Sequence, residues 1–363
     1  MLFLHPSALI LALHLREISS IEISHEAQVG TARRAVHDYA SQVGFGETTL
    51  AEIDIVVQEI GTNAATYSTT GGWLHFTRPL GPAPGLELFY WDTGPGIYNM
   101  DRAIRDGVST SGSLGAGLGA ISRLMDEFEI YSTVAATGRL TLGQMRRTSH
   151  GTAMLARKWV EHEGGNRPAE REEAQRFGVW SRPHPQEEVN GDAYYIARRG
   201  QRTLLSVIDG LGHGHGAKEA ADVACDMLDD WKGERPDELL LAAHDALRAT
   251  RGAVMGIIVI DHEGEVFQYA GVGNIAVRAF GTRQNLALIS TNGTLGLRLG
   301  SLRLWTYPWV EGATVLMTSD GLSESWDIRS YPGLLKRSPQ LMAGLLMRDY
   351  GREADDATVL VAR

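Results

Sequence analysis

The sequence predicts two α+β domains joined by a short linker. Its 363 residues exceed the size of most single domains, which hold about 100–200 residues. Residues 161–176, EHEGGNRPAEREEAQR, carry charge, Gly and Pro but almost no apolar side chain, a composition typical of linkers. On both sides, apolar residues recur at helical spacing in some segments and form short runs in others. We therefore expect an extension over 1–19, a first domain over 20–160 and a second over 177–363.

In the first domain, amphipathic helices precede and interrupt a set of strands. Residues 48–68 place Ile53, Val57, Ile60 and Ala64 on one face at the 3.6-residue period of a helix. The strand-like runs are short, and several are close neighbours in the chain. This mixture predicts helices on one face of an antiparallel sheet. The expected helices cover 25–44, 48–68 and 118–128, and the expected strands cover 72–80, 85–92, 129–134 and 151–159.

The second domain has more strands, with two long helices between them. Many apolar strands with few helices predict a β-sandwich flanked by helices. The expected strands cover 192–200, 202–210, 254–262, 265–273, 274–280, 314–321 and 357–363, and the expected helices cover 217–231 and 236–250.

Composition and charge narrow the classes of function. The formal net charge is −10, and no basic run of useful length appears, which argues against nucleic-acid binding. The single cysteine, Cys225, rules out an internal disulfide and a cysteine-based zinc site. Its setting, ADVACDML, has a helical pattern and predicts a small, buried apolar side chain.

The N-terminal stretch MLFLHPSALILALHLREISS does not have the features of a targeting segment. No basic residue precedes its apolar run, Pro6 interrupts that run, and no small-residue cleavage site follows. The run is also too short to span a bilayer comfortably. We therefore expect a cytoplasmic protein without a membrane partner, and we interpret 1–19 as an extension of uncertain order.

Glu59 and Asn63 are the first candidate pair for chemistry. They are four residues apart on an expected helix, so they share a face beside its apolar stripe. An amide oxygen can bind magnesium, and a carboxylate can orient or deprotonate an attacking hydroxyl, so the pair suits a magnesium–triphosphate. A solvated helix face has the same spacing, so the pair needs support from the rest of the domain.

Asp92 provides part of that support. It follows the apolar run LELFYW and opens the turn DTGPG, in which Gly94 and Gly96 free the backbone. A carboxylate at such a strand end can accept a hydrogen bond from an exocyclic amine such as that of adenine. We therefore interpret this turn as a base-recognition site.

A glycine-rich segment follows, SLGAGLGAISRL, with Gly115, Gly117 and Gly119 directly before an expected helix. Backbone N–H groups at a helix start attract phosphate. The segment lacks the Lys-Ser/Thr ending of the Walker motif. It also lacks the preceding strand of the dinucleotide fingerprint. It is therefore a phosphate-binding candidate of another type.

Together, the segments EIGTNAATYS, DTGPGIYNM, SLGAGLGAISRL and HGTAMLARKW resemble the GHKL-type ATPase domain, and more narrowly the RsbT-like switch serine kinases of bacterial stress signalling. The resemblance spans roughly residues 20–160. It implies an α/β sandwich that binds ATP with Mg²⁺, with Glu59 as the catalytic base, Asn63 as the magnesium ligand and Asp92 as the adenine-reading acid. The other implied nucleotide-binding positions are Gly94, Gly96, Gly115, Gly117, Gly119 and Thr152.

Sensor histidine kinases share this ATP-binding fold. However, no phospho-acceptor box with a dimerising helical hairpin precedes the domain, and HLREIS at 14–19 is a poor match to one. We therefore favour the switch-kinase interpretation over the histidine-kinase one.

Acidic residues mark the second domain at four strand ends or tight turns: Asp192, Asp209, Asp320 and the pair Asp355–Asp356. Because apolar strands adjoin them, we expect these acids to converge at one edge of the sandwich. Clusters of carboxylates bind hard divalent cations, and two such cations can activate a water and stabilise in-line phosphoryl displacement. A single Asp-Gly pair is commonly only a turn. It is their joint occurrence that favours a metal site.

These blocks resemble the metal-dependent PP2C-type phosphatases, in the bacterial branch of the sporulation phosphatase and the RsbX-like stress phosphatases, over about residues 177–363. The resemblance implies an α-β-β-α sandwich that binds two Mn²⁺ or Mg²⁺ ions, with Asp209 bridging both metals. The implied metal ligands are Asp192, Asp209, Gly210 through its carbonyl, Asp320, and Asp355 or Asp356.

Three details of this second resemblance stay open. Asp356 stands where the wider family often has Asn, so either Asp355 or Asp356 is the ligand, and we prefer Asp355. The phosphate-binding arginine of the family is not identifiable, and Arg182 is the candidate. His213 and His215 in GLGHGHGA are either ligands for a softer metal or ordinary loop residues.

The sequence therefore predicts a bifunctional switch protein, an ATP-dependent serine/threonine kinase joined to a divalent-metal-dependent phosphatase. The resemblances imply STAS-domain regulatory proteins as substrates in a stressosome or partner-switching pathway, and a possible homodimer. The alternative is a phosphatase whose N-terminal domain only senses nucleotide or binds a partner. A scaffold with degenerate sites is disfavoured, because every acidic block is occupied.

Overall fold

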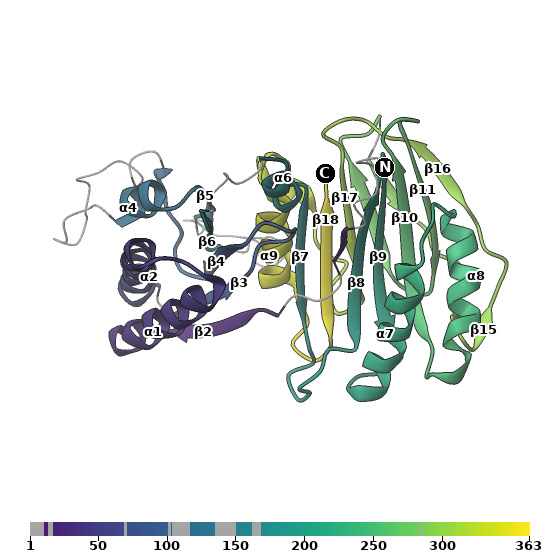
Figure 1. The fold of residues 1–363 in the computed structure, drawn as a ribbon, viewed down its shortest axis with the longest axis horizontal. Coiled ribbons are helices and arrows are strands. Elements are labelled where there is room, and N and C mark those ends of the chain that lie inside the picture. The colour runs from purple at the N-terminus through teal and green to yellow at the C-terminus, as the bar shows by residue number, and fades with distance from the viewer. Residues whose placement is uncertain are drawn as a thin grey trace, which may run out of the picture. The chain divides into compact units, whose positions relative to one another are not determined.

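The chain folds into two compact units in the computed structural model (Figure 1). The N-terminal unit comprises Arg16–Ala174 and Asp327–Leu341, and the C-terminal unit comprises Met1–Leu15, Gln175–Trp326 and Met342–Arg363. The structure describes residues 11–13, 17–68, 71–100, 103, 117–134, 150–161, 168–283 and 285–363.

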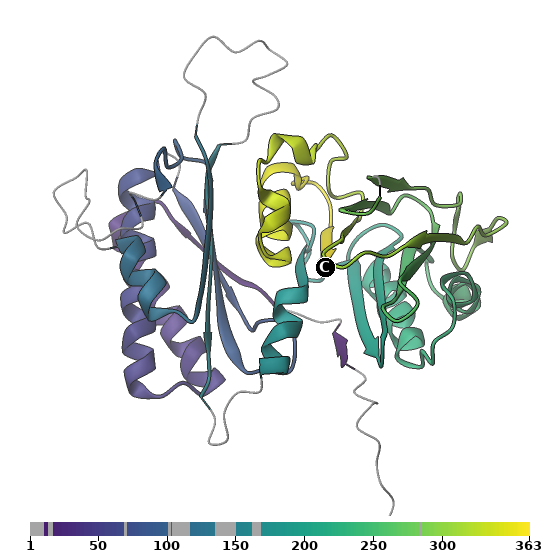
Figure 2. The same ribbon diagram turned by 90° about the horizontal axis from the view of Figure 1, so that it is seen from above.

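The N-terminal unit is a five-stranded antiparallel sheet, in the order β2-β3-β4-β6-β5, with helices on one face. Figure 2 shows α1, α2 and α4 standing on one side of this sheet. The strands are β2 (Ser19–Ile23), β3 (Gly72–Thr77), β4 (Gly85–Asp92), β5 (Glu127–Thr133) and β6 (Gly151–Trp159), and the helices on this face are α1 (Glu26–Val43), α2 (Glu47–Tyr67) and α4 (Gly117–Leu124). A further helix, α6 (Pro168–Arg176), is not part of this core, and its Ala174 is buried with Trp159 of β6.

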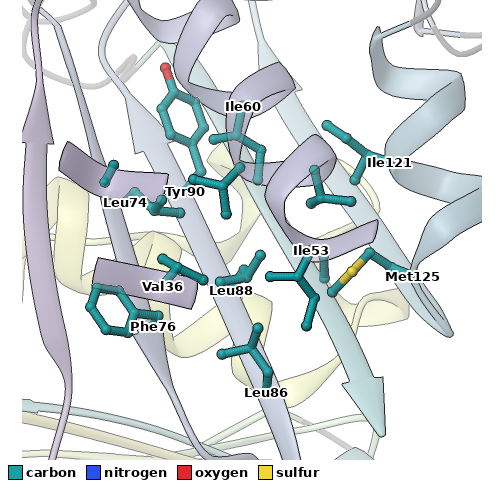
Figure 3. Close-up of a cluster of buried hydrophobic side chains, with 14 of the residues drawn as sticks. Val36, Ile53, Ile60, Leu74, Phe76, Leu86, Leu88, Tyr90, Ile121 and Met125 are labelled. Atoms are coloured by element: carbon teal, nitrogen blue, oxygen red, sulfur yellow. The ribbon is translucent and has the colours of Figure 1, made fainter. Parts of the chain in front are cut away.

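Alternation along the strands builds the core of this unit. Because successive side chains of a strand point to opposite faces, Leu86, Leu88 and Tyr90 of β4 all face the helices. They meet Ile53 and Ile60 of α2, and both isoleucines are almost completely buried (Figure 3). Full burial of such a side chain stabilises the fold by about 1.5–3 kcal/mol. This packing fixes α2, which carries the first candidate pair, against the sheet.

The opposite face of the sheet holds a buried ionic triplet. Arg157 of β6 stands in register between Glu87 of β4 and Glu127 of β5. Arg157 Nε donates to Glu87 Oε2 at 2.8 Å, and its Nη1 donates to Glu127 Oε2 at 3.0 Å. Burial alone would lower the pKa of Arg157, but the two carboxylates outweigh that effect and raise it. The guanidinium therefore stays charged between its partners.

The segment Asp327–Leu341 comes from the sequence range expected for the second domain, yet it is part of the N-terminal unit. It lies along β5. Tyr131 Oη donates to the Pro332 carbonyl at 3.3 Å, and the Ser338 N–H donates to Glu129 Oε2 at 3.0 Å.

The C-terminal unit contains two stacked antiparallel sheets and a separate two-stranded sheet formed by β14 and β15. The six-stranded sheet has the order β1-β8-β9-β10-β11-β16, and the five-stranded sheet has the order β13-β12-β17-β18-β7. Contacts of β17 and β18 with β8 and β9 join the two layers. The strands are β1 (Leu11–Leu13), β7 (Phe177–Arg182), β8 (Asp192–Arg199), β9 (Arg202–Gly210), β10 (Ala253–Asp261), β11 (Val266–Val272), β12 (Ala276–Phe280), β13 (Leu286–Leu288), β14 (Gly293–Thr294), β15 (Arg298–Leu299), β16 (Trp305–Pro308), β17 (Thr314–Thr318) and β18 (Ala357–Ala362).

Helices α7 (His215–Asp229) and α8 (Pro236–Ala246) cover the six-stranded sheet. The buried face of α7 is rich in alanine, including Ala217, Ala220 and Ala224, which lets the helix approach the strands closely. Cys225 is buried on the same helix, as its sequence setting predicts. Among the described residues, the C-terminal unit also contains η1 (Leu247–Ala249). In contrast, η2 (Ile328–Ser330) and η3 (Leu334–Lys336) belong to the segment Asp327–Leu341 of the N-terminal unit, and α9 (Pro339–Tyr350) begins in that segment.

The expected fold class is confirmed, and the differences concern short elements. The helix expected over 118–128 ends at Leu124, because Glu127 already pairs in β5. Within the expected linker, residues 168–176 form α6. Three residues of the expected extension form β1 and pair with β8. No helix among the described residues is long and apolar enough to cross a bilayer.

We expect Glu87→Ala to destabilise the N-terminal unit by about 3–5 kcal/mol. The substitution leaves the buried Arg157 guanidinium with Glu127 but without the carboxylate of Glu87. Native-state hydrogen exchange of the β4, β5 and β6 amides measures this local stability in the full chain. Asp54→Asn, which removes the partly exposed His37–Asp54 pair, is the control and costs at most about 1 kcal/mol. Equal losses in the two variants would contradict the stabilising role of the triplet.

Candidate active sites

In the N-terminal unit, α2 presents Glu59 and Asn63 to the start of α4. Both side chains are partly exposed beside the buried Ile60. A Cβ on Gly117 would lie 2.8 Å from Glu59 Oε2 and 3.5 Å from Asn63 Nδ2. Any larger side chain at position 117 would therefore press on the candidate base. The predicted pair and the described end of the glycine-rich segment lie together.

Asp92 ends β4, and hydrogen bonds from three sides hold its carboxylate. Oδ1 accepts from the N–H groups of Gly94 at 2.8 Å and Thr152 at 3.1 Å. Oδ2 accepts from Tyr90 Oη at 2.8 Å. Burial of Tyr90, together with the charge of Asp92, raises the pKa of the Tyr90 hydroxyl. The phenol therefore stays protonated and continues to donate.

The turn after Asp92 packs on the end of α2. A Cβ on Gly94 would lie 3.4 Å from the Ser68 Cα and 3.5 Å from the Tyr67 carbonyl oxygen. Tyr67 lies one helical turn beyond Asn63 on α2. The same helix therefore carries the magnesium-ligand candidate and contacts the base-recognition turn with its C-terminal end.

A set of hydrogen bonds that the sequence did not predict surrounds this turn. The Ile97 N–H donates to Ser132 Oγ at 2.7 Å, and Ser132 Oγ donates to the Gly151 carbonyl at 3.1 Å. His150 Nδ1 donates to the Gly94 carbonyl at 2.8 Å. Gly151 has a φ of +127° and lies against the Asp92 carbonyl, a conformation and a contact that favour glycine. The HGT triplet at 150–152 is the sequence signal for this arrangement, and the resemblance implies a role only for its threonine.

The other predicted nucleotide-binding residues differ in their surroundings. Thr152 is buried on β6, with its N–H on Asp92. Gly96 has a φ of +76° and packs against the Thr133 carbonyl. Gly119 is buried within α4. Gly115 lies outside the described residues.

In the C-terminal unit, the predicted acids come from both sheets. Asp192 opens β8 and stands opposite Asp209 of β9 in the antiparallel register. Asp320 follows β17, and the pair Asp355–Asp356 precedes β18. Since β17 and β18 contact β8 and β9, these strand ends bring all five residues to one region of the unit.

Hydrogen bonds fix several of these carboxylates. Asp192 is 5% exposed, and its Oδ2 accepts from Ser319 Oγ at 2.6 Å. Ser319 Oγ in turn accepts from the Thr358 N–H at 2.9 Å, which ties the end of β17 to β18. Asp320 Oδ2 accepts from Asn274 Nδ2 at 2.7 Å.

Asp356 has one satisfied and one unsatisfied oxygen. Its Oδ1 accepts from the His184 N–H at 2.8 Å. Its Oδ2 is buried without a hydrogen-bond partner in the described structure. A buried unsatisfied acceptor is unfavourable, and a cation is one group that would satisfy it.

The carboxylates lie close enough to change one another's protonation. Burial first, and then the charges of Asp192, Asp320, Asp355 and Asp356, raise the pKa of Asp209 to about 9. Burial and the nearby Asp356 and Asp320 raise the pKa of Asp192 to about 7, although a hydrogen bond from Ser319 opposes the shift. Burial and Asp355 raise the pKa of Asp320. A concentration of negative charge therefore surrounds Asp209.

The acids form one connected group around Asp209. Asp355 raises the pKa of Asp320, whereas both Asp356 and Asp320 raise the pKa of Asp192. Among the described side chains, no three His, Cys, Asp or Glu residues are arranged to hold a metal ion as they stand. The donor set is nonetheless all oxygen and strongly acidic, which suits a hard divalent cation.

Arg182 lies beside this acidic region. It ends β7 and donates from Nη2 to the Arg352 carbonyl. Burial lowers the pKa of its guanidinium, while Glu353, Asp356 and Asp355 oppose that shift. Arg182 stays a candidate for phosphate binding, as the resemblance suggests.

Two family models match different parts of the chain. Residues 24–142 match the histidine kinase-like ATPase domain, and residues 199–363 match the stage II sporulation protein E (SpoIIE) family.

Comparison with known proteins gives relatives for both parts. The serine/threonine-protein kinase RsbT of Bacillus subtilis (strain 168) is 31% identical over 147 residues, which cover 40% of this chain and 99% of RsbT. The phosphoserine phosphatase RsbX of the same organism is 23% identical over 176 residues, which cover 48% of this chain and 87% of RsbX.

This chain is also similar to a chain of a solved structure. A chain described under "The bacterial stressosome: a modular system that has been adapted to control secondary messenger signaling" is 30% identical, with a TM-score of 0.50, and the match covers 52% of this chain and 98% of that one. The resemblances seen in the sequence are therefore confirmed. The chain belongs to the RsbT family through its kinase-like ATPase domain, and the same polypeptide carries a SpoIIE/PP2C-type serine/threonine phosphatase domain that is homologous to RsbX.

Proposed function

We propose that this chain is a bifunctional switch. Its first domain transfers the γ-phosphate of ATP to a serine or threonine hydroxyl, and its second domain hydrolyses phosphoserine or phosphothreonine. The substrates are STAS-type partner proteins of a cytoplasmic stressosome or partner-switching pathway. The observation that carries the proposal is that one chain retains both the Glu59–Asn63 pair, with Gly117 seated on it, and the acids around Asp209.

For the kinase reaction, Glu59 accepts the proton of the attacking hydroxyl, and Asn63 binds the magnesium of the nucleotide. Asp92 receives the adenine amine, because its carboxylate is already oriented by Tyr90, Gly94 and Thr152. Because Gly117 lies close to Glu59 and has no side chain, it would present only backbone atoms to the triphosphate. The remaining proposed contacts to the nucleotide are Gly94, Gly96, Gly115, Gly117, Gly119 and Thr152.

For the phosphatase reaction, the oxygens around Asp209 would hold two Mn²⁺ or Mg²⁺ ions. Asp209 and the Gly210 carbonyl would be ligands, with Asp320 and Asp355 for one ion and Asp192 for the other. Bound there, the cations would supply charge neutralisation and activation of water. The proximity of Asp356 to Asp192, and the unsatisfied Asp356 Oδ2, favour a role for Asp356 beside Asp192 rather than in place of Asp355.

We expect Glu59→Gln to abolish phosphate transfer, by at least about 10²-fold, while ATP binding is retained, because the amide keeps the shape but cannot accept the proton. Transfer is measured with labelled ATP and a STAS-domain partner, and binding by calorimetry. Glu47→Gln, in the exposed first turn of the same helix, is the control and retains transfer. Full transfer by Glu59→Gln would show that the assigned base is wrong. ATP binding without transfer in the unmodified protein would reduce this domain to a nucleotide-sensing or partner-binding module.

We expect Asp209→Asn to lose manganese-dependent hydrolysis of 4-nitrophenyl phosphate and the rise in melting temperature that Mn²⁺ produces in the unmodified protein. The substitution removes the carboxylate whose pKa all four other acids of the group raise. Asp222→Asn, on the exposed side of α7, is the control and retains both properties. Retained hydrolysis in Asp209→Asn would overturn the site assignment.

A further inference from the structure

The glycine-rich loop GLGHGHGA, residues 210–217, makes room for an arginine side chain that the proposed chemistry does not use. A Cβ on Gly216 would lie 2.6 Å from Arg251 Cζ, and a Cβ on Gly212 would lie 3.7 Å from Arg251 Nη1. A side chain at position 216 would therefore displace the guanidinium. Because Gly216 has none, the Arg251 guanidinium rests on the backbone of the first turn of α7.

The strand register places Arg251 at the edge of the acidic region. Ala253 of β10 stands opposite Gly210, the residue that follows Asp209 on β9. Arg251 precedes Ala253 by two residues, so it lies just beyond the strand end that carries Asp209.

The Arg251 side chain is exposed and has no partner in the described part of the chain, where it forms neither a hydrogen bond nor an ion pair. By contrast, Arg248, three residues earlier, pairs with Asp245 at 3.0 Å. A guanidinium presents its N–H donors in a planar fork that matches the two oxygens of a carboxylate. Arg251 is therefore available to an anionic group of a substrate.

Two exposed leucines lie beside Arg251. Leu211 is 48% exposed and Leu297 is 60% exposed. The Leu211 N–H donates to the Gly252 carbonyl at 3.0 Å, and a Cβ on Gly252 would lie 3.3 Å from Leu297 Cγ. Both leucines thus adjoin the residue that follows Arg251. Exposed apolar side chains that gather beside polar ones are typical of a surface that contacts a protein.

The two histidines of the same loop have other surroundings. His213 Nδ1 lies 2.7 Å from Glu187 Oε1, and the His213 ring stacks on His184. His215 begins α7 and is exposed. Within the part of the chain that the structure describes, no group of three His, Cys, Asp or Glu side chains is arranged to hold a metal ion, so the softer-metal interpretation of these histidines has no structural support.

We propose that Leu211, Arg251 and Leu297 form a docking surface for the protein segment that flanks the phosphoserine or phosphothreonine of the substrate, and that Arg251 pairs with a carboxylate of this segment. The inference rests on the proposed phosphatase function, which it deepens by naming the kind of substrate. A basic side chain at the same place would be repelled by the guanidinium.

The length of the loop separates this surface from the phosphoryl group. In the proposed function, the phosphoryl group binds at the cations held by Asp209 and its neighbours. Gly212, which the Arg251 guanidinium adjoins, is at most about 7 Å of chain beyond Gly210. An extended substrate covers such a separation in about two residues. The group that pairs with Arg251 therefore belongs to a residue next to the phosphorylated one or to the residue after that.

The test compares two phosphoserine peptides. They have glutamate in one case and lysine in the other at the two positions on each side of the phosphoserine, and both carry leucines farther out. kcat and KM for phosphate release are measured with Mn²⁺ at about 0.15 M salt, where exposed charges more than about 8 Å apart are largely screened. The proteins are the unmodified chain, Arg251→Gln, Arg251→Glu and the control Arg248→Gln. Leu297→Ser is compared with Leu241→Ser, which alters a leucine of α8 that is 54% exposed.

The expected result is a kcat/KM at least about tenfold higher for the glutamate peptide with the unmodified chain and with Arg248→Gln. Arg251→Gln reduces this preference to less than about threefold, and Arg251→Glu reverses it. Leu297→Ser raises KM for both peptides about 3–10-fold, whereas Leu241→Ser does not. Because both peptides are measured on each protein, a variant that folds or binds cations less well lowers both values and leaves their ratio unchanged.

An equal preference in the unmodified chain and Arg251→Glu would overturn the role of Arg251, and an unchanged KM in Leu297→Ser would overturn that of the leucines. Hydrolysis of 4-nitrophenyl phosphate by an unmodified chain that releases phosphate from neither peptide would overturn the docking surface as a whole. An unmodified chain that hydrolyses none of the three substrates would instead overturn the proposed phosphatase function.

Discussion

The C-terminal unit depends on the balance of charge around Asp209. Burial and four neighbouring carboxylates raise its pKa to about 9, so without a cation this group holds a proton at neutral pH. The β8–β9 register, the stacking of the two sheets and the Ser319 hydrogen bonds all serve to gather these acids. The arrangement is costly as a structural feature alone, and the proposed divalent cations would offset that cost by replacing the protons. The fold and the proposed chemistry therefore share one constraint.

The candidate site of the N-terminal unit contains fewer charged side chains than the acidic site of the C-terminal unit. One helix, α2, buries its apolar face in the core, presents Glu59 and Asn63 to Gly117, and supports with its end the turn that follows Asp92. The donors on Asp92 are backbone N–H groups and the Tyr90 phenol, so this carboxylate is held in a fixed orientation. In the proposed function, ATP would complete this site, whereas divalent cations would complete the acidic site of the other unit.

The sequence alone was sufficient for the fold class, the long helices and the acids at strand ends, because these depend on local periodicity and on turn chemistry. It was not sufficient for features that arise from distant pairings. Ser132 and His150 are ordinary in sequence, and their contacts with the Asp92 turn exist only because β4, β5 and β6 are neighbours. Likewise, Glu187 is one of several acids in a loop, and its partner His213 became evident only from the fold.

In the proposed function both activities act on STAS-type partners, and one experiment tests whether they share a substrate. The most direct measurement is the intact mass of a purified STAS-domain protein encoded nearby, after incubation with magnesium-ATP and Mn²⁺, with the unmodified chain and Asp209→Asn in parallel. We predict a gain of one phosphate that accumulates with Asp209→Asn and is removed by subsequent addition of the unmodified chain. No gain with either protein, while both still bind ATP, would contradict the bifunctional switch.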